Sequence, residues 1–226
     1  MAIKISKNTL DPRAAVRFRS EANFMGQIST HPYILSVYEN GVTVNGRGYT
    51  VFEYAPGGNY KTFLESNRLN ADQMLTVGIN LASALSTAHR EGIIHRDIKP
   101  SNILINAHNM PMLADFGIAG TVYGRPGVGF TIAWAAPEVL AQGGGGNESS
   151  DIYSLGVVAY EGLCGHRPFT GATPVDIAAA HVNNPVPPLP DTVDVQLREF
   201  VMSMLAKDPL DRPKAVSYTH LTLPTI

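Results

Sequence analysis

Three residues in the stretch "HRDIKPSN", residues 95–102, could act on a single reacting group. Asp97 could orient the proton of an attacking hydroxyl, Lys99 could stabilise developing negative charge, and Asn102 could give an oxygen to a metal ion. Thirteen residues after Asn102, Asp115 adds a hard carboxylate of the kind that Mg²⁺ prefers. Phosphoryl transfer needs mainly such positioning and charge stabilisation, so the pattern predicts that chemistry. The alternative, from these residues alone, is a polar turn.

The patterns that surround these residues predict a sheet first and helices afterwards. Strands are expected at residues 1–6, 34–41 and 48–55, with a turn at Asn45-Gly46, and short β pieces at 93–95, 102–106 and 111–116. Helices are expected from Asp11-Pro12 to His31-Pro32, from an Asn70 cap with Gln73 to near Gly92, over 150–165 and over 195–208. Loops are expected at 117–129, 143–146 and 183–191. This order predicts an α+β fold with two unequal lobes.

Composition excludes several classes of protein. The chain has 226 residues, of which 44% are apolar and 16% charged, which is typical of a folded globular protein. A formal net charge of −2 argues against nucleic acid or an anionic bilayer as a partner selected by bulk charge. The sequence has no apolar run long enough for a membrane helix and no secretory signal at its start. Its one cysteine, Cys164, is expected to be a small buried residue.

Three motifs in order resemble those of protein kinases. "HRDIKPSN", "DFG" at 115–117 and "APE" at 136–138 resemble the catalytic loop, the magnesium loop and the end of the activation segment. Lys99 follows the serine/threonine pattern, and the stretches at 167–190 and 205–213 resemble the bacterial Hanks-type kinases. The resemblance covers about residues 1–215. It implies a bilobal kinase fold, with a partial N-lobe at 1–55, a C-lobe at 56–216 and a tail outside the family at 217–226.

The resemblance also implies roles for the polar residues. Asp97 would be the catalytic base, Lys99 the charge stabiliser, and Asn102 and Asp115 the ligands of Mg²⁺, which Mn²⁺ can replace. The resemblance further assigns a phosphate clamp to Lys4 of "AIK" with Glu21, and it assigns the adenine contacts to Ala2, Phe52, Glu53, Ala55 and Leu104. Read without the resemblance, these are an exposed strand lysine, a surface acid and core or strand-end residues.

Further matches imply support for the site. His95, Phe116, Met25 and Val37 match a stacked apolar spine. Asp151 matches the residue that anchors the catalytic loop, because a buried carboxylate there can accept backbone N–H groups. Glu138 and Arg212 match a structural ion pair.

Two departures from the family are visible. The Gly-rich loop that covers the ATP phosphates would lie before Lys4 and is absent from the sequence. If Met1 is the true start, weak nucleotide binding and little catalysis are expected, but we expect the chain to be a fragment of a truncated gene. The Thr-rich, β-biased tail from Ser217 does not continue the family pattern, and we expect it to be an artefact of cloning, frameshift or sequencing.

The activation segment carries its own expectations. Arg96 beside Asp97 is typical of kinases activated by a phosphate in this segment, and Thr121 is the candidate phosphosite. Thr131 matches the substrate-loop threonine, although Phe130 replaces the commoner glycine.

The resemblance implies a serine/threonine kinase that transfers the γ-phosphoryl group of Mg-ATP to protein hydroxyls. A pseudokinase scaffold and a small-molecule phosphotransferase of the same fold stay open as alternatives. The expected partners are protein substrates, with no nucleic acid, and with dimerisation for autophosphorylation as an open expectation. The expected location is cytoplasmic, either as a separate kinase or as the intracellular domain of a membrane receptor kinase.

Overall fold

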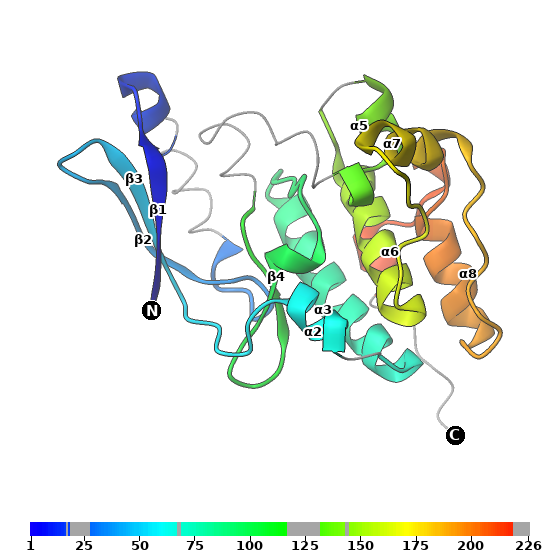
Figure 1. The fold of residues 1–226 in the computed structure, drawn as a ribbon. Coiled ribbons are helices and arrows are strands. Elements are labelled where there is room, and N and C mark those ends of the chain that lie inside the picture. The colour runs from blue at the N-terminus through cyan, green and yellow to red at the C-terminus, as the bar shows by residue number, and fades with distance from the viewer. Residues whose placement is uncertain (17, 19–27, 67–68, 117–131, 143–144, 219–226) are drawn as a thin grey trace.

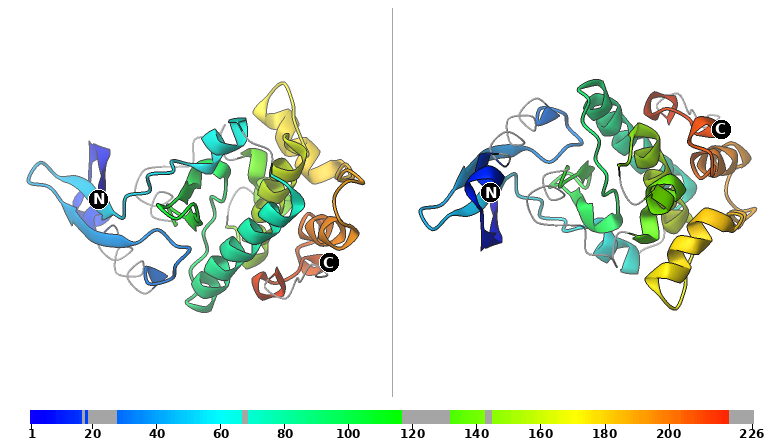
Figure 2. Two further views of the ribbon diagram at one scale, coloured as in Figure 1. Left: turned by 90° about the horizontal axis from the view of Figure 1, so that it is seen from below. Right: turned by 90° about the horizontal axis from the view of Figure 1, so that it is seen from above.

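The computed structural model describes residues 1–16, 18, 28–66, 69–116, 132–142 and 145–218. A small antiparallel sheet forms one end of the molecule, and a larger, mainly helical part forms the other end (Figure 1, Figure 2). The predicted α+β class with two unequal parts is therefore confirmed.

The sheet has three strands in the spatial order β1-β3-β2. They are β1 (Ala2–Thr9), β2 (Val37–Val42) and β3 (Arg47–Phe52). The predicted turn between β2 and β3 contains Gly46 at φ 73°, a left-handed conformation that glycine adopts without steric cost. In the β1–β3 register Ala2 faces Phe52 and Lys4 faces Thr50, so β1 brings both predicted nucleotide contacts to this sheet.

The helix predicted after β1 is described only in part. The Asp11 carboxylate accepts a hydrogen bond from the N–H of Ala14 at 2.7 Å, which is the expected cap. Phe18 and Ile28 are both fully buried, as their spacing predicts. Residues 17 and 19–27, including Glu21 and Met25, lie outside the described part of the chain.

The longest helix, α3 (Ala71–Arg90), has the predicted capping box. The Asn70 side chain accepts from the N–H of Gln73, and the Gln73 side chain accepts from the N–H of Asn70. The predicted apolar face of α3 is buried: Met74, Val77, Leu81, Leu85 and Ala88. The short helix α2 (Tyr60–Ser66), which the patterns did not predict, precedes it.

A second, two-stranded sheet follows α3 and carries the predicted catalytic residues at its ends. It consists of β4 (Ile103–Ile105), entered through the 3₁₀ turn η1 (Pro100–Asn102), and β5 (Pro111–Leu113). The strand predicted at residues 93–95 is absent from this region, and that prediction is wrong. The N–H of His95 donates to the side chain of Asp151 and so is not available to a neighbouring strand.

The other helical elements follow in the C-terminal part of the chain, where α3 and α6 supply much of the buried core. They are the 3₁₀ turn η2 (Ile132–Trp134), α5 (Pro137–Gln142), α6 (Glu148–Cys164), α7 (Pro174–Asn183), α8 (Val195–Met204), the 3₁₀ turn η3 (Pro209–Asp211) and α9 (Ala215–Tyr218). Most of α6 is buried, as predicted. A Cβ atom at Gly156 would lie 2.9 Å from the Cβ of Met204, so α6 and α8 can approach this closely only because position 156 is glycine.

Cys164, at the end of α6, is half-buried, and burial raises the pKa of its thiol. None of the helices within the described ranges is both long and apolar enough to cross a bilayer.

Candidate functional site

The loop that holds the predicted catalytic residues is anchored by Asp151 of α6. The buried carboxylate accepts from the N–H of His95 and from the N–H of Arg96, each at 2.8 Å. It also lies 2.9 Å from the Nε2 atom of His89 on α3. Arg96 has φ 66°, so the chain turns sharply here and presents Asp97 beyond the anchor. The predicted anchoring role of Asp151 agrees with these contacts.

His95 connects the loop that holds Asp97 to the segment after β5. Its Nε2 atom lies 3.0 Å from the carbonyl of Ala114, and its Nδ1 atom accepts from the N–H of Asp97 at 3.3 Å. Burial lowers the pKa of His95 more than the nearby carboxylates raise it, so the ring is neutral with the proton on Nε2. The ring packs on Phe116 with 4.5 Å between centroids, as the predicted spine requires.

Asp97, Lys99 and Asn102 meet at one carboxylate oxygen. The Oδ2 atom of Asp97 lies 2.7 Å from the Lys99 ammonium and accepts from the Asn102 amide nitrogen at 2.9 Å. The same amide donates to the Asp97 carbonyl at 2.8 Å. The Oδ1 atom of Asp97 is shielded from solvent and has no hydrogen-bond partner among the described residues. One carboxylate oxygen is thus held in place and the other is left to accept.

Asp115 and Lys4 form a second polar pair. The Lys4 ammonium on β1 donates to both carboxylate oxygens of Asp115, at 2.8 and 2.9 Å. The two side chains are 47% and 34% exposed, so this contact adds little to stability. Asp115 has φ 61°, a left-handed conformation that is uncommon for non-glycine residues but that aspartate adopts more readily than most of them.

A backbone hydrogen bond joins the two polar groups. The N–H of Ala114 donates to the carbonyl of Asn102 at 2.9 Å, which places Asp115, the next residue, beside the catalytic loop. A continuous series of contacts therefore runs from Lys4 through Asp115 and Asn102 to Asp97. Residues that the sequence separates by more than 90 positions form one site.

The predicted adenine contacts gather on an apolar cluster beside this site. Phe52 is buried with Leu35, Met112 and Ala114, and Ala55 and Leu104 pack against them. The N–H of Glu53 donates to the carbonyl of Ser36 at 2.9 Å, which fixes the backbone after β3. With Ala2 opposite Phe52, the predicted positions lie on adjoining parts of the fold.

Comparison with known proteins assigns the chain to a family. The family profile described as protein kinase domain matches residues 1–222. The chain belongs to the protein kinase family. It is 37% identical over 224 residues to the serine/threonine-protein kinase PknA of Mycobacterium tuberculosis, a match that covers 94% of this chain and 52% of PknA.

Other relatives of this kinase chain are also bacterial. It is 39% identical over 206 residues to a Corynebacterium efficiens protein named serine/threonine-protein kinases drp72, covering 87% of this chain and 39% of that one. It is 36% identical over 227 residues to PknB of Mycobacterium leprae, covering 94% and 36%. The chain therefore spans about half, or less, of the length of these relatives.

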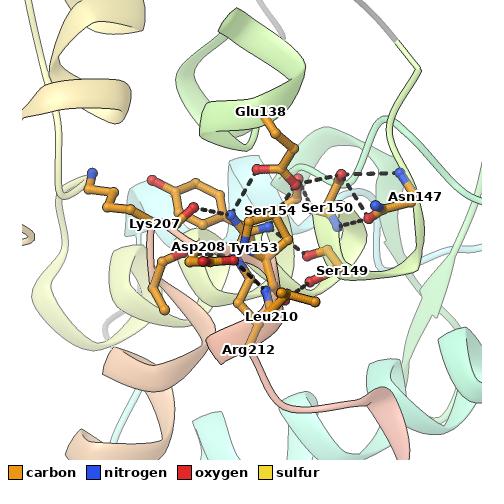
Figure 3. A network of polar contacts seen from close by, with 12 residues as sticks. Glu138, Asn147, Ser149, Ser150, Tyr153, Ser154, Lys207, Asp208, Leu210 and Arg212 are labelled. Carbon is orange, nitrogen blue, oxygen red and sulfur yellow. Dashed lines mark hydrogen bonds and ion pairs between the residues drawn. The ribbon is translucent and has the colours of Figure 1, made fainter. Parts of the chain in front are cut away.

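The kinase C-lobe contains the predicted ion pair between Glu138 and Arg212 (Figure 3). The Arg212 guanidinium donates to both oxygens of Glu138, at 2.7 and 2.8 Å, and its side chain has no exposed surface. Burial pushes the pKa of Glu138 up, but the hydrogen bonds from Arg212 and Ser150 outweigh it and the pKa lies below its ordinary value. The end of the activation segment is thus fastened to the segment after α8.

Several contacts of the kinase site were missed at the sequence level. His89 joins Asp151, and the Trp134 indole N–H donates to Glu161 at 3.0 Å. The buried His181 lies between Tyr153 and the carbonyl of Ala133. A histidine on the apolar side of a helix is a weak signal, because it more often completes a core than serves a site.

Some predicted residues lie outside the described chain: Glu21, Met25, Thr121, Phe130 and Thr131. Of the tail that was predicted to start at Ser217, two residues are helical in α9 and residues 219–226 are not described. The boundaries at 55 and 216 stay predictions.

Proposed function

We propose that this chain is the catalytic domain of a serine/threonine protein kinase that transfers the γ-phosphoryl group of Mg-ATP to protein hydroxyls. The observation that carries the proposal is the state of Asp97. Lys99 and Asn102 hold its Oδ2 atom, and Oδ1 has no hydrogen-bond partner in the described structure. A partly exposed carboxylate that is fixed at one oxygen and has no hydrogen-bond partner at the other is suited to orient a hydroxyl.

The steps of the transfer fall to separate side chains. The Asp97 carboxylate orients the acceptor hydroxyl and takes its proton as the oxygen–phosphorus bond forms and the bond to the leaving diphosphate breaks. The Lys99 ammonium, beside Asp97, offsets negative charge on the phosphoryl group in flight. Lys4 would hold the remaining phosphates, with Glu21 as its proposed partner.

The oxygen donors near Asp97 fit a divalent cation. The Asn102 amide nitrogen donates to Asp97, so the amide oxygen points away from Asp97 and is available to a cation. The backbone bond from Ala114 to Asn102 brings the neighbouring Asp115, with its carboxylate, to the same part of the fold. We propose Asn102 and Asp115 as the ligands. Mg²⁺, when bound, supplies charge neutralisation to the phosphate oxygens. The Lys4 ammonium now on Asp115 would then turn to the nucleotide phosphates.

The adenine ring would lie against the apolar cluster of Phe52, Ala55 and Leu104, under Ala2, with the backbone of Glu53 and Ala55 at its edge. We propose a cytoplasmic location, because the phosphate donor is ATP. We also keep dimerisation for autophosphorylation and a longer parent protein, with or without a membrane segment, as proposals.

The test is Asp97→Asn in the whole chain. The wild-type protein is expected to bind Mg-ATP and to phosphorylate casein on serine or threonine. The variant is expected to lose transfer by at least about a hundredfold, because the base is gone, and to keep nucleotide affinity and the unfolding transition. Undiminished transfer in the variant would refute the role of Asp97. Nucleotide binding without transfer in the wild type would fit both the scaffold alternative and the low activity expected of a fragment, and transfer to small alcohols alone would favour the small-molecule alternative.

A further inference from the structure

His181 of α7 makes a contact that the transfer chemistry does not explain. Its side chain is completely buried, and its Nε2 atom lies 3.1 Å from the carbonyl oxygen of Ala133 in η2. Ala133 is itself 3% exposed, so this carbonyl needs a donor from the protein. His181 lies 48 residues further along the chain. The contact therefore joins α7 to the segment just after Thr131.

The direction of both hydrogen bonds on His181 follows from the partners. A carbonyl oxygen can only accept, so Nε2 carries the proton and donates to Ala133. The Nδ1 atom then accepts from the hydroxyl of Tyr153 at 2.9 Å. Burial lowers the pKa of His181 to about 4, which keeps this single neutral form at physiological pH.

The backbone and ring of His181 are held as firmly as its nitrogens. Lys207 donates from Nζ to the His181 carbonyl at 2.5 Å, and the same ammonium lies 4.4 Å from the centre of the Phe169 ring. The Phe169 and His181 rings pack edge to face with 4.9 Å between centroids. A side chain fixed on so many sides can determine where its partner lies.

The contact at Ala133 is one of two that hold the same segment. At the other end, Glu138 is held by Arg212. The Arg212 guanidinium lies 4.9 Å from the centre of the Tyr153 ring, while the Tyr153 hydroxyl serves His181 (Figure 3 shows Tyr153 beside Arg212). Tyr153 of the buried helix α6 thus links the two attachment points of residues 133–138.

We propose that His181 is a positioning residue for the protein substrate, which sets the place of residues 132–134 by donating to the Ala133 carbonyl. The inference rests on the proposed kinase function, in which the chain after Thr131 receives the acceptor protein. His181 does not touch the reacting atoms in this proposal. Its loss should therefore weaken acceptor binding and leave ATP binding alone.

Two substitutions separate the hydrogen bonds of His181. In His181→Gln the amide nitrogen is as many bonds from Cβ as Nε2, so the donor to Ala133 is kept. In His181→Asn the amide oxygen matches Nδ1, so the bond from Tyr153 is kept and the donor to Ala133 is lost. Tyr153→Phe is the control that removes the other bond and leaves the Ala133 contact.

The first readout is steady-state transfer to casein by the whole chain. His181→Asn is expected to raise the KM for casein by roughly tenfold, the size of one lost hydrogen bond to a buried carbonyl, with the KM for ATP within about twofold. His181→Gln and Tyr153→Phe are expected to stay within about threefold of the wild type for both substrates. Equal KM changes in His181→Asn and His181→Gln, or a matching rise in the KM for ATP, would overturn the proposal.

The second readout does not need activity. Amide hydrogen exchange in residues 132–136 is expected to be about tenfold faster in His181→Asn than in His181→Gln. Equal exchange in the two variants would refute the positioning role even if the wild type is an active kinase. If exchange is faster in His181→Asn than in His181→Gln but the wild-type chain has no transferase activity, the positioning of residues 132–134 stands and the proposed function is rejected.

Discussion

Replacing Arg212 by methionine should destabilise the C-lobe far more than a typical surface change. The guanidinium donates to Glu138 and to three backbone carbonyls, those of Ser149, Ala206 and Lys207, with none of its side chain exposed. Methionine fills much of the volume but donates nothing. Breaking a buried pair by removing one partner costs about 3–5 kcal/mol, because the other charge and its acceptors stay desolvated. A domain with about 5–15 kcal/mol in total would lose a large share.

The single tryptophan of the chain provides the assay. Trp134 lies within the segment 133–138 that this network holds, and its indole N–H donates to Glu161 of α6, so its fluorescence reports unfolding of the C-lobe. With a urea m-value of about 3 kcal/mol/M, Arg212→Met should lower the midpoint by about 1 to 2 M. A midpoint within about 0.3 M of the wild type would refute the energetic reasoning.

A double-mutant cycle separates the ion pair from the backbone bonds. Glu138→Leu alone leaves the Arg212 charge buried, while Glu138→Leu with Arg212→Met removes both charges. The double variant should be more stable than the sum of the single changes predicts, by about 2 kcal/mol or more. Additive free energies of unfolding would mean that the pair itself contributes nothing.

Three further outcomes follow from other parts of the structure. Lys4→Met should weaken Mg-ATP binding at least about tenfold in titration calorimetry. It should change the free energy of unfolding by less than about 1 kcal/mol, since the pair of Lys4 with Asp115 is exposed, and a large loss of stability would contradict this. Asp151→Asn should lower the free energy of unfolding in urea by about 2–3 kcal/mol and should also slow transfer. The reason is that an amide cannot replace a carboxylate that accepts from two backbone N–H groups and contacts His89. Slower transfer with an unchanged free energy of unfolding would argue against anchoring. Acidification should destabilise the fold through His181, because the pKa of His181 falls from 6.5 to about 4 on folding. Between these pH values the unfolded chain binds more protons than the folded chain, so stability is lost as pH drops from 6.5 to about 4, by about 3 kcal/mol in all. Urea midpoints measured from pH 7 to 4 should fall less steeply in His181→Gln, and parallel curves would show that His181 does not titrate as stated.

The sequence was most informative where local physics decides the structure. The capping box of Asn70 and Gln73, the cap by Asp11 and the apolar face of α3 depend on residues within a few turns of one another, and all were confirmed. The grouping of Asp97, Lys99 and Asn102 is local for the same reason, since six residues span it. The family resemblance added the distant pair of Glu138 with Arg212 and assigned Lys4 and Asp115 to one site, which periodicity alone does not do. It did not predict the direct contact between Lys4 and Asp115, because it assigned Glu21 to Lys4.

The failures share one physical cause. Residues 93–95 look like a strand, yet the N–H of His95 is taken by Asp151, 56 positions away. No sequence pattern identified His181 or the helix α7, and the donation from His181 to Ala133 depends on how α7 packs against η2. In both cases a long-range hydrogen bond decides the outcome, and no local pattern in the chain encodes it.

The left-handed backbone at Arg96 and Asp115 has a practical cost for protein engineering. Each non-glycine residue in that region of conformational space costs about 1 kcal/mol or more, so glycine would relax the chain at both places. A library screened only for heat tolerance would therefore tend to accept glycine at position 115 and discard the carboxylate there. Selection for thermal stability alone would in this way remove the proposed Mg²⁺ ligand, and any thermostabilised version should be chosen with a nucleotide-binding screen applied in parallel.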